Sequence, residues 1–300
     1  MSRRQTLHDY SKRVLKALEH AQRHLDDDLS PERLARVAAF SPFHFQRIFR
    51  GLVGESVMEH VRRLRLERAA RRLTGGRATV TAAAMGAGYE SHEAFSRAFR
   101  RHFGCSPSSY RRERAEQPLP EVPSAVHFRD DHIALALRPS TIIPPGFPVI
   151  IESRPAQRVA YLRHTGPYED CSKAWDQLGM WAARHGHFGS SSQMLGLCHD
   201  DPEITEPHQL RYDACLSLDA PFETEDDIGQ KTIAGGDFAV VRYRGPYEGL
   251  SAVYQHLIGS WLPRSGREPV DGPCIEVYWN DPESCVAEDL ETDVCLPLSP

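Results

Sequence analysis

Residues 85–104 read MGAGYESHEAFSRAFRRHFG, and residues 34–50 read LARVAAFSPFHFQRIFR. Each stretch ends in an amphipathic, arginine-rich helix that follows a turn, the pattern of a helix-turn-helix motif. A single match is common by chance. Two matches about fifty residues apart, joined by a basic helix, predict a DNA-binding helical domain in the first third of the chain.

The first motif separates an apolar face from a polar face. Phe45, Ile48 and Phe49 follow helical spacing and are expected to face the core. Ser41 is the predicted N-cap, and Pro42 follows it in the first turn. The opposite face, expected to point outward to DNA, consists of Phe43, Gln46, Arg47 and Arg50.

The second motif repeats this arrangement, with Phe95, Ala98 and Phe99 predicted to pack inward. Arg can pair with guanine, Gln with adenine and Glu with cytosine. The outward residues predicted to contact DNA are His92, Glu93, Ser96, Arg97 and Arg100. We assign Arg101, Arg111 and Arg112 to phosphates, which set orientation rather than sequence preference.

Residues 58–73 are predicted to form the helix between the motifs, ended by Gly75 and Gly76. Such a helix is about 24 Å long. A rigid spacer of this size can hold two recognition helices roughly 34 Å apart, in successive major-groove segments. One chain could then read a two-part site without a palindrome.

The charge of the chain is unevenly distributed. The total is −5, which alone argues against nucleic acid. Residues 1–116, however, carry 23 basic and 13 acidic residues, which leaves 13 of the 36 basic and 28 of the 41 acidic residues for the rest. This asymmetry indicates a polyanion-binding module fused to a second, acidic module.

The remaining composition excludes several classes of protein. Seven cysteines without a CxxC pair are expected to be buried apolar residues rather than metal ligands. No window approaches the length of a membrane span, so we expect a soluble, cytoplasmic chain without a membrane partner. We also expect no metal and no cofactor. Proline-rich stretches predict a linker at residues 114–147.

The back half contains an internal repeat. RHTGPYE at residues 163–169 recurs as RYRGPYE at 242–248, an offset of 79, and LRYDACL at 210–216 recurs as LETDVCL at 290–296, an offset of 80. Residues 148–152 and 158–163 are predicted strands, and residues 168–184 a helix. We therefore expect an α+β domain of two pseudo-symmetric β-α-β-β units.

One carboxylate in this domain is a candidate ligand-binding residue. In residues 274–279, strand alternation puts Glu276 on one face with Tyr278, while Ile275, Val277 and Trp279 take the other. The 80-residue offset pairs Glu276 with Gly196, so the acid is present in one repeat only. Trp175 and Tyr254 occupy equivalent helix positions and could form aromatic walls. A carboxylate among aromatic rings suits a cationic apolar ligand.

Residues 7–113 resemble the DNA-binding domain of the AraC/XylS family of bacterial transcription regulators. The resemblance rests on GAGYES at residues 86–91, FSRAFR at 95–100 and FGCSPSSYR at 103–111. It implies seven helices and base contacts from two recognition helices. Phe40 stands where the family often has a small turn residue.

Residues 148–298 resemble the GyrI-like small-molecule-binding domain, on both Gly-Pro-Tyr turns, EVYWNDP at residues 276–282 and CLPL at 295–298. Together the resemblances imply a multidomain transcription regulator: an all-α domain at 7–113 that binds promoter DNA, and an effector-binding domain at 148–298, with RNA polymerase as a further partner. Two alternatives stay open, a hydrolase using Glu276 as general base and a module that binds another protein. We expect no catalytic residues.

Overall fold

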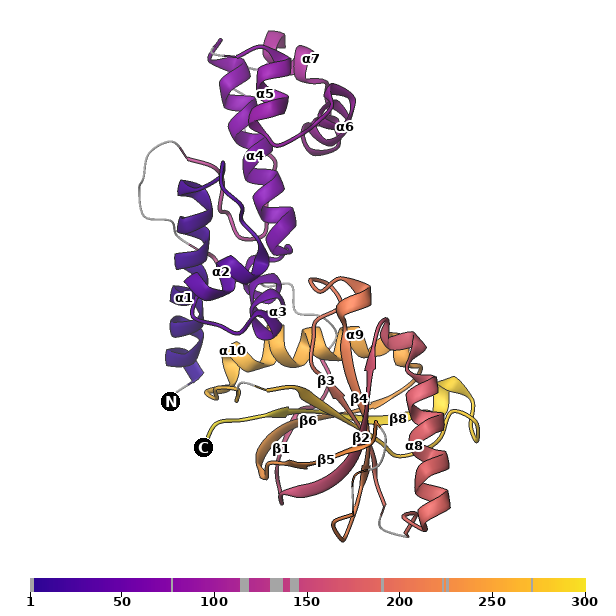
Figure 1. The fold of residues 1–300 in the computed structure, drawn as a ribbon. Helices are drawn as coiled ribbons and strands as arrows, with labels where there is room; N and C mark the ends of the chain where they lie inside the picture. The colour runs from indigo at the N-terminus through magenta and orange to yellow at the C-terminus, as the bar shows by residue number, and fades with distance from the viewer. Residues whose placement is uncertain are drawn as a thin grey trace. The chain divides into compact units, whose positions relative to one another are not determined.

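The computed structural model describes residues 3–76, 78–113, 119–129, 137–140, 146–189, 192–222, 224, 227–270 and 272–300. Contacts within the chain divide it into two compact units, residues 7–143 and residues 144–300 together with 1–6. In Figure 1 the first unit runs from indigo to magenta, and the second continues to yellow. The multidomain architecture and both fold classes expected from the sequence are confirmed.

The described part of residues 3–113 forms seven helices. They are α1 (Arg3–Arg23), α2 (Pro31–Val37), α3 (Pro42–Val53), α4 (Val57–Thr74), α5 (Val80–Gly86), α6 (His92–Phe103) and α7 (Pro107–Glu113). Helices α2 to α6 each begin after a Ser or Thr whose side chain accepts a hydrogen bond from the backbone amide three residues on. These caps satisfy amide groups that lack a partner within the helix, so the sequence itself sets the helix starts.

The turn of the first motif uses a residue other than glycine in a left-handed conformation. Ala39 has φ of 54°, where the second motif has Gly88 at 79°. Phe40, the unusual residue of this turn, is 8% exposed, and the guanidinium of Arg13 lies 3.4 Å from its ring centroid. Arg13 also donates to the carbonyls of Ala38 and Ala39. The turn therefore keeps its shape through contacts with α1.

A buried carboxylate joins α4 to the segment after α7. Glu67 is fully buried and accepts hydrogen bonds from Arg63 at 2.8 Å, His127 at 3.1 Å and the backbone amide of Phe128 at 2.7 Å. Arg63 also pairs with Glu55 in the turn between α3 and α4. One ion network thus ties the α3–α4 turn, the middle of α4 and residues 127–128 together.

Parts of the predicted linker pack on this helical unit. Gln22 of α1 donates to the carbonyl of His127 and accepts from the amide of Arg129. The amide of Ser140 donates to the carbonyl of Leu52 in α3 at 2.7 Å. A Cβ at Gly54, whose φ is 85°, would lie 2.7 Å from Pro123. Residues 119–129 and 140 therefore contact α1, α3 and α4 rather than forming a free tether.

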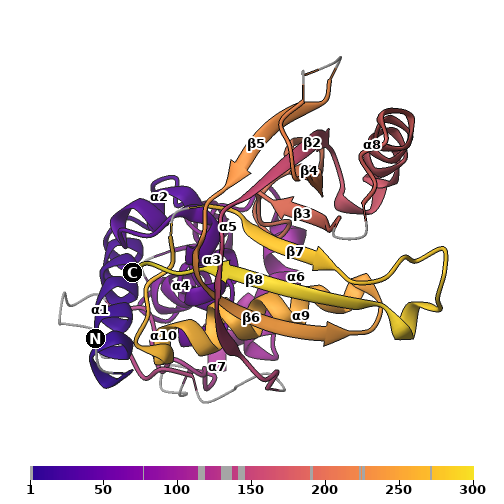
Figure 2. The same ribbon diagram turned by 90° about the horizontal axis from the view of Figure 1, so that it is seen from below.

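The second unit is one eight-stranded antiparallel sheet with helices (Figures 1 and 2). Its strands are β1 (Ile150–Arg154), β2 (Gln157–Thr165), β3 (Met194–Cys198), β4 (Arg211–Ser217), β5 (Gly229–Ile233), β6 (Gly236–Arg244), β7 (Cys274–Tyr278) and β8 (Glu291–Pro297). The long helices are α8 (Ser172–His185) and the continuous run of α9 (Leu250–Tyr254), the π-helical η4 (Gln255–Trp261) and α10 (Leu262–Ser265). Short 3₁₀ turns are η1 (Tyr168–Asp170), η2 (Pro207–Gln209), η3 (Tyr247–Gly249) and η5 (Ala287–Asp289).

The strand order β1-β6-β8-β7-β3-β4-β2-β5 has a pseudo-two-fold symmetry. Exchanging β1 with β5, β2 with β6, β3 with β7 and β4 with β8 gives the same order read backwards. Each repeat starts with one strand more than the predicted β-α-β-β unit. The central strands β3 and β7 pair with Gly196 opposite Glu276, residues that the 80-residue offset also relates. The pseudo-symmetry axis therefore passes through this residue pair.

The two faces of the sheet have separate apolar cores. On one face, Ala174, Leu178 and Trp181 of α8 pack against β2 and β4. On the other face, Ile275 and Val277 pack with residues of β2, β3, β4, β6 and β8. This confirms the predicted alternation in β7, because Glu276 and Tyr278 lie on the helix-covered face.

Candidate functional sites

Helix α6 presents a polar, exposed face. Phe95, Phe99 and Phe103 are buried against Tyr110 and apolar residues of α4 and α5. On the opposite side, the predicted DNA-contacting residues His92, Glu93, Arg97, Arg100 and Arg101 are exposed, and Ser96 is half-buried. Ser96, Arg97, Arg100 and Arg101 line a shallow hollow of about 350 Å³. Arg111 and Arg112 of α7 are also exposed. This face matches the surface expected from the sequence.

Helix α3 contains the other four predicted DNA-contacting residues. Gln46 and Arg47 lie between Phe45 and Ile48, and their outward orientation toward DNA stays a prediction. Phe45, Ile48 and Phe49, which were expected to face the core, are buried. The Arg47 guanidinium lies 4.8 Å from the ring centroid of Phe43 and donates to the Phe43 carbonyl, so it folds back on its own first turn. Phe43 and Arg50 are half-buried. A DNA-contacting role for these four residues stays a prediction.

Several arginines of α4 hold the helical unit together. Arg65 donates to the carbonyls of Leu25 and Asp27, and Arg68 forms two hydrogen bonds with Asp26 and one with the carbonyl of Gly86. These residues fix the loop between α1 and α2 against α4. Their guanidinium groups are therefore structural, whereas Arg62, Arg71 and Arg72 are exposed.

In the sheet unit, Glu276 is 6% exposed and lies within reach of three hydrogen-bond donors. Its Oε1 accepts from the Tyr254 hydroxyl at 2.8 Å and from the Cys198 thiol at 3.4 Å. Its Oε2 accepts from the Tyr278 hydroxyl, which is also 2.8 Å from the Tyr212 hydroxyl. Glu276 thus lies in a network contributed by β3, β4, β7 and α9.

Aromatic rings surround this network. The ring centroid of Trp175 lies 5.7 Å from that of Tyr278 and 6.3 Å from that of Tyr212. Tyr247 contacts Tyr278 at 5.7 Å, and Tyr168 contacts Tyr212 at 5.8 Å. We call Glu276, Cys198 and these aromatic residues, with Tyr254, the Glu276 cluster. Tyr247 is 39% exposed and Trp175 half-buried, so this side of the cluster reaches the surface.

The electrostatics of the Glu276 cluster favour a positively charged partner. Burial, together with the negative charge of Glu276, raises the pKa of Tyr278 and Tyr212 well above its ordinary value, and raises the pKa of Tyr247 to about 12. These hydroxyls therefore stay protonated at neutral pH. Among the residues that the structure describes, no Lys, Arg or His forms an ion pair with Glu276. A buried carboxylate without a cation lacks its usual compensation.

Gly196, opposite Glu276, leaves room for the tyrosines. A Cβ at this position would collide with the Tyr212 hydroxyl and lie 2.7 Å from the Tyr278 hydroxyl. The site therefore requires glycine at position 196, on the pseudo-symmetry axis.

We expect Gly196→Ala to displace both tyrosines and to lower the free energy of unfolding of the sheet unit by about 1–3 kcal/mol, as overpacking does in other cores. Thermal unfolding followed by near-UV circular dichroism measures this. The matched control is Gly179→Ala in α8, where a Cβ meets nothing within 4 Å, and a gain of about 1 kcal/mol is expected. Equal melting temperatures for Gly196→Ala and the natural chain would contradict the argument.

The structure brings together all four predicted ligand-site residues, Glu276, Tyr278, Trp175 and Tyr254. Sequence reasoning missed Tyr168, Tyr247, Tyr212 and Cys198 as members of this cluster. The first two belong to the repeated Gly-Pro-Tyr turns and Tyr212 to the repeated LRYD segment, so the repeats contained the signal. This signal alone does not identify the cluster, because only the strand pairing shows that the two turns and β4 lie close to β7.

Two further expectations concern cysteines and metals. All seven cysteines are free thiols, of which Cys198, Cys215, Cys274 and Cys295 are buried. In the described part of the chain, no group of three or more His, Cys, Asp or Glu side chains could hold a metal ion. No described helix is long and apolar enough to cross a membrane.

Comparison with known proteins supports both units. A family model described as the GyrI-like small molecule binding domain matches residues 147–299, just over half of the chain, and a helix-turn-helix domain model matches residues 34–113. The probable transcriptional regulator YgiV of Escherichia coli K12 is 31% identical over 147 residues, covering 48% of this chain and 92% of that protein. The regulatory protein SoxS of Salmonella typhimurium is 35% identical over 94 residues, covering 31% of this chain and 88% of that protein.

Among solved structures, the EcmrR–DNA complex is similar with a TM-score of 0.46 and 16% identity, over 51% of this chain and 57% of that chain. On the two family models and the curated relatives, the chain belongs to the GyrI-like family and joins that domain to an AraC-type helix-turn-helix domain, the make-up of a DNA-binding transcription regulator.

Proposed function

We propose that the protein is a sequence-specific regulator that binds promoter DNA through α3 and α6 and binds a small cationic, apolar effector at the Glu276 cluster. The observation that carries the effector half is the buried Glu276 carboxylate, which has three hydrogen-bond donors and no basic partner among the described residues. RNA polymerase is included among the proposed partners, because a regulator bound at a promoter lies beside that enzyme.

The chemistry of the cluster sets the class of effector. A cation inserted between the rings of Trp175, Tyr247 and Tyr278 would gain charge attraction from Glu276 and cation–π attraction from the rings. A strongly hydrated inorganic cation would lose its water without gaining enough oxygen ligands. A delocalised organic cation loses little hydration and gains apolar contact as well. The site therefore suits amphipathic organic cations.

The DNA half is tested by Arg97→Ala and Arg101→Ala in the full chain. Duplexes are first selected from a random-sequence library with the natural protein, and affinity is then measured by fluorescence anisotropy between 50 and 300 mM salt. Arg97→Ala, proposed to read a base, should cost about 1–3 kcal/mol on the selected duplex and little on an unselected one. Arg101→Ala, proposed to contact a phosphate, should weaken both and reduce the salt slope by about 1.

Lys16→Ala serves as the control, since Lys16 is an exposed cation on α1 outside the two motifs. If Lys16→Ala weakens binding as much as Arg97→Ala, the exposed face of α6 is not the recognition surface.

Mass analysis of a ligand recovered with the protein tests the proposed binding of an effector. An unchanged cation supports sensing, and a cleaved product would point to the hydrolase alternative.

A further inference from the structure

Thr292 of β8 has a buried hydroxyl without a hydrogen-bond partner. The residue is 1% exposed, and its Oγ1 atom has no donor or acceptor within reach in the part of the chain that the structure describes. Strand pairing places Thr292 opposite Tyr278 of β7, and Val294 opposite Glu276. Thr292 therefore lies on the helix-covered face of the sheet, beside the Glu276 cluster. Its hydroxyl can form a hydrogen bond with a bound molecule without breaking an existing one.

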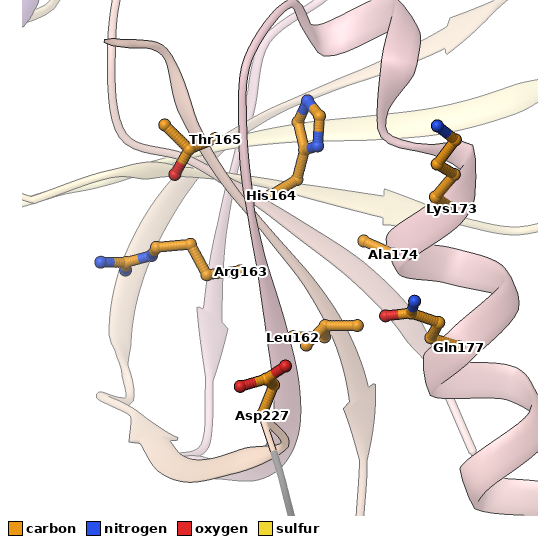
Figure 3. A pocket seen from close by; sticks show the side chains of 8 residues that line it. All are labelled: Leu162, Arg163, His164, Thr165, Lys173, Ala174, Gln177 and Asp227. Atoms are coloured by element: carbon orange, nitrogen blue, oxygen red, sulfur yellow. The ribbon is translucent and has the colours of Figure 1, made fainter. Parts of the chain in front are cut away.

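The first repeat has a tyrosine at the equivalent position. The 80-residue offset relates Thr292 to Tyr212 of β4. His164, which lies on the same side of β2 as α8 in Figure 3, pairs opposite Tyr212. Its counterpart Tyr243 of β6 pairs opposite Thr292. The second repeat therefore has a smaller side chain, with an unpaired hydroxyl, where the first repeat has an aromatic ring.

The two Gly-Pro-Tyr turns follow these strands and are held alike at their proline. His164 Nε2 donates to the carbonyl of Pro167 at 2.9 Å. The Tyr243 hydroxyl donates to the carbonyl of Pro246 at 3.2 Å. Up to this point the two repeats use the same contact, so the turns start from equivalent places.

The tyrosines of the two turns are held differently. The Tyr168 hydroxyl donates to the carbonyl of Asp200 at 2.8 Å and accepts from its amide at 3.1 Å. The Tyr168 ring also contacts Tyr212. Tyr247 is 39% exposed, and its hydroxyl makes no hydrogen bond to any residue that the structure describes. Its ring contacts Tyr278 instead. The second turn therefore holds its tyrosine by fewer contacts, on the side of the cluster where Thr292 replaces a ring.

We propose that the effector carries, besides its positive charge, a neutral hydrogen-bonding group that pairs with the Thr292 hydroxyl. This inference rests on the proposed function and narrows the class of effector to apolar organic cations with a polar substituent. The substituent takes the place that the ring of Tyr212 has in the first repeat. Because Thr292 is buried, a side chain must move to admit the substituent, and Tyr247 is held by few contacts.

The spacing of the two groups follows from the strand register. Thr292 is two residues before Val294, which lies opposite Glu276, so Thr292 and Glu276 are diagonal neighbours on adjacent strands. Such residues lie roughly 7–8 Å apart. The charge and the polar group of the effector should be separated by a similar distance, about the length of one substituted phenyl ring.

The experiment compares two phosphonium cations of nearly the same shape by isothermal titration calorimetry with the full chain. One is (4-hydroxymethylphenyl)triphenylphosphonium, and the other has an ethyl group in place of the hydroxymethyl group. The measured quantity is the ratio of their affinities. Thr292→Val keeps the shape of the side chain and removes the hydroxyl. We expect it to lower the ratio of hydroxymethyl to ethyl affinity by about three- to tenfold, as one neutral hydrogen bond allows.

The melting temperature gives a second measurement. Thr292→Val should raise it by roughly 2–4 °C, because the variant no longer buries an unpaired hydroxyl. The matched control is Thr232→Val, the same substitution at an exposed position of β5, which should leave the ratio unchanged. A fall in the melting temperature of Thr292→Val would show that the hydroxyl has a partner within the protein, and would overturn the inference.

Glu276→Gln separates this inference from the proposed function. It should weaken both ligands alike and leave their ratio unchanged, because both carry the same charge. If the natural chain binds neither ligand, the proposed class of effector fails and this inference fails with it. If both ligands bind and their ratio is the same in Thr292→Val as in the natural chain, this inference alone is overturned.

Discussion

Replacing Glu276 by glutamine should lower the affinity of the protein for tetraphenylphosphonium by 30-fold or more while leaving its melting temperature unchanged or higher. The 30-fold loss is about 2 kcal/mol, the lower end of what a buried charge pair contributes to binding. Glutamine keeps the shape of the side chain and an oxygen acceptor for Tyr254 or Tyr278. Stability should not fall, because the natural carboxylate is buried without a basic partner among the described residues.

Isothermal titration calorimetry measures the affinity, and triphenylphosphine oxide, which is neutral, serves as the comparison ligand. Its affinity should be nearly the same in the natural protein and in Glu276→Gln. The control variant is Glu206→Gln, which removes an equal charge from an exposed position of the same unit. A loss of affinity for the neutral ligand in Glu276→Gln would assign the effect to shape rather than charge and contradict the proposed class of effector.

Replacing Glu67 by alanine should lower the free energy of unfolding of the helical unit by about 3–5 kcal/mol, since it leaves the buried Arg63 without one of its two carboxylate partners. It also removes the acceptor of His127 and of the Phe128 amide, so residues 127–128 lose their attachment to α4. The expected result is a separate, earlier unfolding transition of the helical unit in calorimetry, with loss of DNA binding at 37 °C.

The pH dependence of this effect has a defined sign. Burial acts to raise the pKa of Glu67, but the hydrogen bond from His127 and the charge of Arg63 outweigh it, so the pKa is lowered. Its stabilising contribution is therefore present above the unfolded value of 4.5 and lost as the pH falls below it. Glu67→Gln should flatten this part of the stability curve. Glu32→Ala, at an exposed position of α2, is the control, and a similar loss there would contradict the assignment.

Helices α3 and α6 of the two motifs show what amphipathic patterning can identify. In α6 the spacing of Phe95, Phe99 and Phe103 correctly identified the buried side, because these three are the buried residues of that helix. In α3 the spacing of Phe45, Ile48 and Phe49 identified buried residues in the same way. Periodicity identifies the side that packs most tightly, but it does not show how much of the remaining circumference other residues cover.

The candidate effector site shows a similar division. Strand alternation and the repeat offset selected Glu276 and Tyr278, because both depend only on spacing along the chain. Tyr212 and Cys198 could not be selected this way. They lie near Glu276 because β3 pairs with both β7 and β4. The spacing of residues along the chain does not predict this strand order.

The sequence by itself determined the helix starts, because Ser and Thr caps set them. It also determined the tandem motifs, the internal repeat and the difference between the repeats that leaves one acid opposite a glycine. Those features depend on neighbours within a turn of helix or on comparison of one stretch with another. Only the tertiary structure decided that the repeats meet at the Gly196–Glu276 pair and that residues 127–128 are held against α4 by Glu67. Each of these depends on contacts between residues far apart in the chain, whose formation is governed by the packing of whole elements.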